Sequence, residues 1–178
     1  MADKKKVRVP IIRMEQLEDA IYDMTIEEKE MAAAAKAGQF LSLYLDDESR
    51  LLPRPISICE INKEEGQLRV VYRVTGANTG TEQFSKLTAG DTVPVIGPLG
   101  NGFPLEKAEG KKVFLMGGGI GVPPILELAK QMQCEKKQIV VGYRDIQTFL
   151  KEQFEANGEL YISTEDGSVG TKGNVMHA

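Results

Sequence analysis

The chain has 178 residues, of which 22 are basic and 26 acidic, so its formal net charge is −4. This near-balance excludes a general nucleic-acid-binding surface and is typical of an ordinary soluble protein. Neither a signal peptide nor an apolar run of the roughly 18 residues that a membrane span needs is present, so we expect a cytoplasmic protein.

Cysteine and histidine are scarce. Cys59 and Cys134 lie far apart without CxxC spacing, which signals neither a disulfide framework nor a metal site. The single histidine, His177, all but excludes histidine-based triads and multi-histidine metal centres. We therefore predict no catalytic side chain and no metal ligand in this sequence.

Short alternating apolar runs separated by turns fill the first hundred residues. They predict two strands within 8–26 and further strands over 39–45, 56–61, 67–74 and 92–96. Propensity favours a short helix over 27–37, with a charged loop as the alternative, and a long rigid turn is expected over 97–104. Many short strands indicate a barrel or a sandwich.

Arg54 stands between two prolines, Pro53 and Pro55. The prolines remove amide donors and favour an extended strand entrance or edge. The arginine offers a planar fork of donors suited to a phosphate, and Ser57 offers a hydroxyl for a heteroatom of a flat ring. These residues suggest a nucleotide cofactor, although an exposed charge in a turn is the alternative.

A small, polar loop over 75–81 precedes a short predicted helix over 82–87. Amides at the helix start, with the hydroxyls of Thr79 and Thr81, would form an anion site for a pyrophosphate. The alternative is a surface loop capped by threonine. Because the strand before this loop could lie beside Arg54, the two segments could bind one diphosphate.

After residue 108 the pattern changes. An apolar run over 113–116 precedes glycines at 117, 118, 119 and 121, and a helix from Pro123 to Met132 follows. Further elements are predicted over 138–143 (strand), 146–156 (helix) and 160–164 (strand), which makes a βαβαβ unit of the nucleotide-binding type. The glycine loop is not a regular GxGxxG, and close helix packing is its alternative explanation. We predict two domains, 1–108 and 109–178.

Seven stretches together resemble the ferredoxin reductase-like flavoproteins, and among them the electron-transfer subunits of NAD-linked dihydroorotate dehydrogenases. They are residues 37–40, 54–57, 71–74, 80–81, 97–103, 117–124 and 164–173. The resemblance implies an antiparallel β-barrel that binds FAD, followed by a parallel α/β domain that binds NAD.

The resemblance also implies roles for individual residues. Arg54 would contact the FAD diphosphate, Gly80 and Thr81 would hold phosphate, and Ser57 would lie near the reactive nitrogen of the flavin. The remaining FAD contacts would be Pro55, Ile56, Val71, Tyr72 and Arg73. The NAD phosphates would lie at Gly117, Gly118, Gly119, Ile120 and Gly121, and Glu165 and Asp166 would favour NAD over NADP by charge.

Two departures from the family matter. The loop 76–81 is about two residues longer than the usual Gly-x-Gly-Thr. The family also continues into more of the NAD domain and a cysteine-rich tail that ligates a 2Fe-2S cluster through four thiolates, which two cysteines cannot supply. With three predicted parallel strands, we expect a C-terminally truncated member whose α/β domain is incomplete, with the strand at 113–116 lacking a neighbour on one side.

The function implied is electron transfer through FAD between NAD and a partner dihydroorotate dehydrogenase subunit in pyrimidine biosynthesis, within a hetero-oligomer. One alternative is another reductase subunit of the same superfamily, of the sulfhydrogenase γ or NADH-ferredoxin reductase type. Another is a non-catalytic flavin-binding module that docks to a dehydrogenase.

Overall fold

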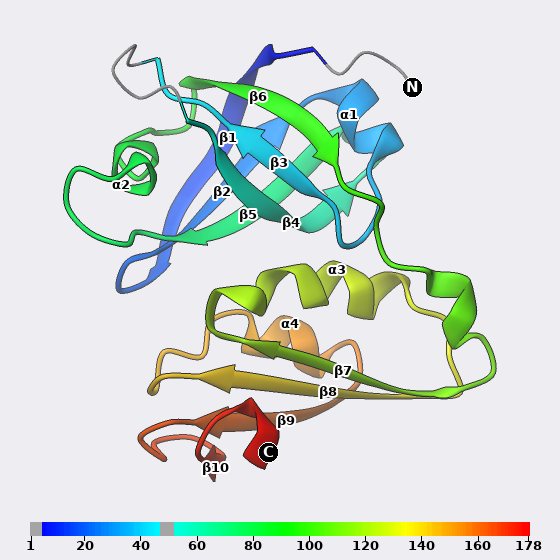
Figure 1. Ribbon diagram of the computed structural model, residues 1–178. Helices are drawn as coiled ribbons and strands as arrows, with labels where there is room; N and C mark the ends of the chain where they lie inside the picture. The colour runs from blue at the N-terminus through cyan, green and yellow to red at the C-terminus, as the bar shows by residue number, and fades with distance from the viewer. Residues whose placement is uncertain (1–4, 47–51) are drawn as a thin grey trace. The chain divides into compact units, whose positions relative to one another are not determined.

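The computed structural model describes residues 5–46 and 52–178, and the chain divides into two compact units, Met1–Gly102 and Phe103–Ala178 (Figure 1). The division lies a few residues before the boundary at 108 expected from the sequence. Among the described helices, none combines the length and hydropathy of a membrane span.

The first unit is a closed antiparallel barrel with the strand order β1-β2-β5-β4-β3-β6, so the expectation of a barrel is confirmed. Because β1 pairs with both β2 and β6, the sheet closes on itself. The strands are β1 (Val7–Glu18), β2 (Ile21–Glu27), β3 (Phe40–Leu43), β4 (Arg54–Asn62), β5 (Gln67–Arg73) and β6 (Thr92–Leu99).

Inward-facing apolar side chains fill the barrel. Met24, Ile26, Leu41, Ile58 and Val70 have no exposed surface and belong to one core cluster. Burying each such side chain contributes about 1.5–3 kcal/mol relative to leaving it in water. The alternation seen in the sequence therefore specifies which face of each strand points inward.

Two short helices accompany the barrel. The predicted helix over 27–37 is α1 (Lys29–Ala34), whose start is capped by the Glu28 carboxylate, which accepts a hydrogen bond from the Met31 amide. It ends at Ala34, before Gly38. The second helix, α2 (Gly80–Phe84), begins two residues earlier than predicted because Thr79 forms its N-cap.

The rigid turn predicted over 97–104 is partly wrong, because Gly97, Pro98 and Leu99 continue β6. Leu99 pairs with Phe40 of β3. A Cβ built on Gly97 would lie 2.4 Å from Leu41 Cδ2, so glycine allows β3 to approach closely enough for the strand to continue. The local preferences of Gly97 and Pro98, taken alone, favour a turn.

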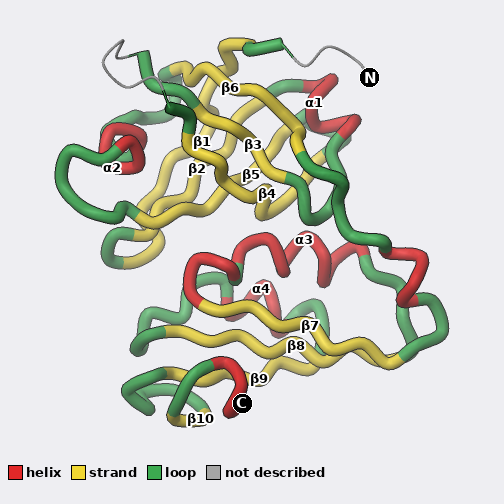
Figure 2. The backbone as a smooth tube through the Cα atoms, viewed as in Figure 1, coloured by secondary structure: helices red, strands yellow, loops and turns green. Residues whose placement is uncertain are grey.

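The second unit is a parallel sheet with the order β10-β9-β8-β7 and with α3 and α4 on one face (Figures 1 and 2). Three 3-10 turns complete it: η1 (Leu105–Ala108), η2 (Gly119–Gly121) and η3 (Val175–His177). Its other elements are β7 (Lys112–Gly118), α3 (Pro123–Gln131), β8 (Lys136–Tyr143), α4 (Lys151–Glu155), β9 (Glu159–Thr164) and β10 (Thr171–Lys172).

Two predictions for this unit need correction. The sheet has a fourth parallel strand, the two-residue β10, which was too short to show a pattern. The helix predicted from Ile146 begins only at Lys151 because Leu150 has a left-handed backbone (φ 67°). The preceding segment is instead held by the Tyr143 hydroxyl, which donates to the carbonyl of Phe149 at 2.8 Å.

The edge position predicted for residues 113–116 agrees with the structure. β7 pairs with β8, and within residues 5–46 and 52–178 no other strand pairs with it.

Candidate functional site

The candidate site begins where β4 enters the barrel. Arg54 and Pro55 pair with β3, whereas pairing of β4 with β5 begins only at Ile58. Proline is therefore accommodated where one side of the strand carries no ladder. The sequence prediction of a strand entrance at Arg54 is confirmed.

Arg54 and α2 come together in the structure. A Cβ built on Gly80 would lie 2.6 Å from Arg54 Nε and 3.0 Å from Cζ, so the guanidinium lies directly against the first residue of the helix. Arg54 Nη1 also donates to the carbonyl of Leu52 at 2.8 Å. The two segments that could bind one diphosphate are thus adjacent, although the whole of β5 lies between them in the sequence.

The threonine hydroxyls at this helix start have structural roles. Thr79 Oγ1 accepts a hydrogen bond from the amide of Glu82 at 3.2 Å, as the side chain of an N-cap residue does. The same oxygen lies 3.1 Å from Thr81 Oγ1. Thr79 also donates to the carbonyl of Gly76. The capping alternative therefore holds for Thr79, and its contact with an anion stays a prediction.

Aromatic packing anchors α2. Phe84 is fully buried and meets the ring of Tyr72 edge-on, with centroids 6.3 Å apart. Tyr72 in turn stacks on Tyr22 at 6.0 Å. Because these rings belong to the barrel core, they hold the Gly80–Arg54 contact in place.

Tyr72 carries a polar atom without a partner. Its side chain is 2% exposed, and its hydroxyl makes no hydrogen bond to any residue that the structure describes. Burial raises the pKa of Tyr72, so the phenol stays protonated and able to donate. A buried donor of this kind can accommodate a polar atom of a bound cofactor.

The other FAD residues named from the sequence face in different directions. Ile56 is buried in the barrel core, whereas Pro55 is exposed and Ser57 half-buried. Val71 is buried and Arg73 half-buried. Pro55 and Ser57 are thus the residues of this segment whose side chains remain accessible to a ring.

The glycine loop follows β7 as predicted and leads through η2 into α3. A Cβ on Gly117 would lie 2.9 Å from Ile125 Cγ1 and 3.0 Å from the carbonyl oxygen of Gly121, so helix packing explains this glycine. Gly119 has φ +55° and, like Gly121, has open space beside its Cα. Ile120 is exposed. The later glycines of the loop are those that a phosphate could approach.

Glu165 and Asp166 follow β9, and both are exposed. The Asp166 carboxylate is held by hydrogen bonds within its own loop. The Asp166 carboxylate accepts hydrogen bonds from the amide of Ser168 at 2.9 Å and from its hydroxyl at 2.7 Å, which lower the pKa of Asp166. The loop is closed further by Thr164, whose hydroxyl donates to the carbonyl of Val169. Asp166 therefore has a structural role in the loop besides its charge.

Sequence reasoning missed one buried polar residue beside the site. Gln39 is 7% exposed, donates from Nε2 to the carbonyl of Gly100 at 2.6 Å and accepts the amide of Lys36 at 2.8 Å. It thereby ties the loop before β3 to the end of the barrel. A glutamine directly before an apolar strand was the available signal.

Comparison with known proteins adds family information. Residues 12–103 match the model of the oxidoreductase FAD-binding domain family. The chain is 43% identical over 169 residues to a protein of Streptococcus pneumoniae serotype 4 named dihydroorotate dehydrogenase B (NAD(+)), electron transfer subunit, covering 93% of this chain and 66% of that protein. A protein of the same name from Bacillus caldolyticus is 39% identical over 173 residues, with 94% and 66% covered.

Solved structures share the fold. An NADH-dependent reduced ferredoxin-NADP oxidoreductase superposes with a TM-score of 0.83 at 27% identity, covering 97% of this chain and 61% of that one. A ferredoxin NADP+ reductase from Neisseria gonorrhoeae with bound FAD and NADP gives a TM-score of 0.82 at 17% identity, with 97% and 74% covered. The chain thus spans about two thirds of the length of the sequence relatives it matches.

Proposed function

The chain belongs to the family of oxidoreductase FAD-binding domains, and we propose that it is the electron-transfer part of an NAD-linked dihydroorotate dehydrogenase. The identity to named electron transfer subunits supports this assignment. The observation that carries it is the contact between Arg54 and Gly80, which sets a cationic side chain beside the start of α2, where the FAD diphosphate would bind.

Arg54 is the principal FAD contact in this proposal. Its guanidinium would form charge-assisted hydrogen bonds with the diphosphate, worth about 1.5–3 kcal/mol. Gly80 and Thr81 would hold the phosphate through their backbone amides at the start of α2, beside the Arg54 guanidinium that occupies the space next to the Gly80 Cα. Ser57 and Pro55 would border the flavin ring together with Val71, Tyr72 and Arg73.

The second unit would hold NAD. The amides of Gly119, Ile120 and Gly121, at the start of the nine-residue helix α3, would receive the NAD phosphates, with Gly117 and Gly118 shaping the turn. Glu165 would disfavour a 2′-phosphate by charge. Bound FAD supplies the redox chemistry between a nicotinamide and single-electron carriers, while the protein binds and orients both cofactors.

The proposed partner is the catalytic dihydroorotate dehydrogenase subunit, in a hetero-oligomer that serves pyrimidine biosynthesis. The 2Fe-2S cluster of the intact family needs four thiolates. Cys59 is buried in the barrel unit and Cys134 is half-buried in the second unit, and two cysteines cannot supply these four ligands. Cysteines that form no disulfide also fit a cytoplasmic location.

The visible absorption spectrum of the purified chain, recorded before and after NADH under anaerobic conditions, tests this function. We expect a flavin spectrum that bleaches on NADH addition. A flavin that stays oxidised would favour the non-catalytic docking module, and a colourless protein that takes up no added FAD would refute the assignment.

A further inference from the structure

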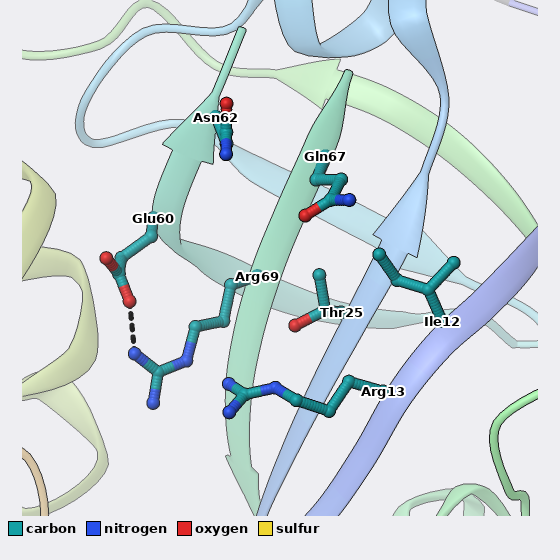
Figure 3. A pocket seen from close by; sticks show the side chains of 7 residues that line it. All are labelled: Ile12, Arg13, Thr25, Glu60, Asn62, Gln67 and Arg69. Carbon is teal, nitrogen blue, oxygen red and sulfur yellow. Dashed lines mark hydrogen bonds and ion pairs between the residues drawn. The ribbon is translucent and has the colours of Figure 1, made fainter. Parts of the chain in front are cut away.

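The outer face of the barrel carries a hollow of about 390 Å³ that the proposed cofactors do not use. Its lining residues come from β1, β2, β4 and β5, and most of them are polar (Figure 3). They are Ile12, Arg13, Thr25, Glu60, Asn62, Gln67 and Arg69. We call it the outer hollow.

Two irregularities in strand pairing border the outer hollow. The register between β1 and β2 shifts between Ile11 and Arg13, and the register between β4 and β5 shifts between Ile58 and Glu60. A bulge bends its strand, increases the local twist and re-aims side chains. The two shifts thus bring Arg13 and Glu60 onto the outer face that β2 and β5 share.

A buried carboxylate holds the two arginines of the outer hollow. Asp23 has no exposed surface, and its Oδ2 lies 2.7 Å from Arg13 Nη2 and 2.7 Å from Arg69 Nη2. Arg69 Nε donates to the same carboxylate, at 3.0 Å to Oδ1. Both guanidinium groups are therefore held at one point, with Arg69 only 8% exposed.

Both arginines keep hydrogen-bond donors to spare. A guanidinium has five N–H groups. Arg69 donates to Asp23 and Glu60, and Arg13 donates to Asp23 and Glu15. Neither arginine uses all five of its N–H groups in these contacts. The side chains of Thr25 and Gln67 add to this supply, since neither makes a hydrogen bond to the part of the chain that the structure describes.

Glu60 shows how Arg69 receives a carboxylate. Its Oε2 forms an ion pair with Arg69 Nη1, as the dashed line in Figure 3 marks. The Glu60 side chain is 23% exposed, so it can turn out toward water, unlike Asp23. With Glu60 withdrawn, Asp23 and Glu15 would balance the two guanidinium charges, but Arg69 Nη1 would lack the carboxylate it now contacts, and an incoming carboxylate could take that place.

We propose that the outer hollow binds a small molecule that carries a carboxylate. The ligand carboxylate takes the place of Glu60 beside Arg69 and receives the remaining N–H groups of Arg13. Because the hollow is larger than one carboxylate, the ligand extends to a second polar group that bonds with Thr25 and Gln67. None of the residues that line the outer hollow is a proposed FAD or NAD contact, so the inference stands without them.

Acetate and succinate are suitable probes. Each is titrated into the full chain at constant ionic strength, and the side-chain Nε–H NMR signals of Arg13 and Arg69 are followed. We expect saturable shifts at roughly millimolar concentration, with succinate binding more tightly than acetate. Signals that never saturate, or that respond equally to chloride, would overturn the proposal.

Two variants should change the affinity for succinate in opposite directions. Arg13→Gln should weaken succinate by about tenfold, and Glu60→Gln should tighten it by about tenfold because a competing carboxylate is gone. Arg8→Gln is the matched control, since Arg8 forms an exposed pair with Asp46 on the same barrel, and should leave the affinity unchanged. An equal loss in both arginine variants would show a general charge effect and contradict a built site.

Gln67→Leu separates a small molecule from the other source of a carboxylate, an acidic side chain of a partner protein. It should reduce the affinity for succinate to that for acetate. If acetate and succinate bind equally and Gln67→Leu changes neither, the outer hollow recognises a bare carboxylate terminus, and the small-molecule proposal is wrong.

Discussion

Gly80 and the guanidinium of Arg54 occupy adjoining space: a Cβ on Gly80 would be 2.6 Å from Arg54 Nε. Two segments that are distant in sequence therefore depend on each other sterically. The missing side chain at position 80 leaves the space that the Arg54 guanidinium occupies.

Gly80→Ala should therefore separate stability from cofactor binding. Alanine favours α2 by up to about 1 kcal/mol through helix propensity, so the barrel should unfold at the same or a higher urea concentration. The displaced Arg54 should lose hydrogen bonds worth about 1.5–3 kcal/mol in FAD affinity. Fluorescence titration of FAD measures this loss. Gly121→Ala, where a Cβ meets open space, is the control, and equal FAD affinity in both variants would contradict the role of Arg54.

Asp23→Asn should destabilise the barrel strongly. Asp23 is fully buried against Arg69, and removing one partner of a buried ion pair costs about 3–5 kcal/mol because the other charge stays buried. Urea denaturation followed by circular dichroism measures the cost. Arg8→Gln breaks an exposed pair with Asp46 and should cost at most about 1 kcal/mol. Similar losses in the two variants would mean that Asp23 is solvated.

Gly142→Ala should loosen the C-terminal turn. A Cβ at 142 would lie 2.8 Å from Val175 Cβ and 3.1 Å from its amide nitrogen, whereas one at Gly118 would lie 3.8 Å from the nearest atom of Val175. Overpacking of this kind costs about 1–3 kcal/mol. Hydrogen exchange at residues 175–177 should accelerate in Gly142→Ala and remain unchanged in Gly118→Ala. Adding Val175→Ala should restore the slow exchange; a double variant as fast as the single one would refute the steric explanation.

Glu159 should titrate far below an ordinary glutamate. Its carboxylate accepts hydrogen bonds from Lys136 at 2.8 Å and Tyr161 at 2.5 Å, which lower its pKa from 4.5 to about 2. A lowered pKa stabilises the fold above pH 4.5, and this contribution is lost as the pH falls toward 2. Carboxyl NMR titration of Glu159 measures the midpoint directly. Lys136→Gln should raise it, and a wild-type midpoint near 4.5 would show that the pair does not persist in solution.

Much of this fold was predictable because its elements have regular periods. Strands such as β2 alternate polar and apolar residues from Asp23 to Glu27, and α3 repeats apolar residues at helical spacing after two prolines. Predictions failed where tertiary contacts override local preference. Leu150 adopts a left-handed backbone beside a hydrogen bond from Tyr143, and Gly97 continues a strand because Leu41 approaches it closely.

The candidate site was predictable in part for the same reason. Arg54 and Gly80 lie in recognisable local patterns, but their contact depends on the closure of the barrel. The outer hollow was not predicted, because Asp23 and Arg69 look like ordinary surface charges in sequence. Only the pairing of β2 with β5, which sets Asp23 beside Val71 and Thr25 beside Arg69, brings the charges together.

Because β1 and β6 both belong to the first unit, the barrel can close before the second unit has been synthesised. Every strand of the barrel, together with Arg54 and Gly80, precedes residue 103, where the second unit begins. At roughly 5–20 residues per second, a ribosome would need roughly 4–15 s more to add residues 103–178. The nascent barrel can therefore close, and meet a flavin nucleotide, while the rest of the polypeptide is still being translated.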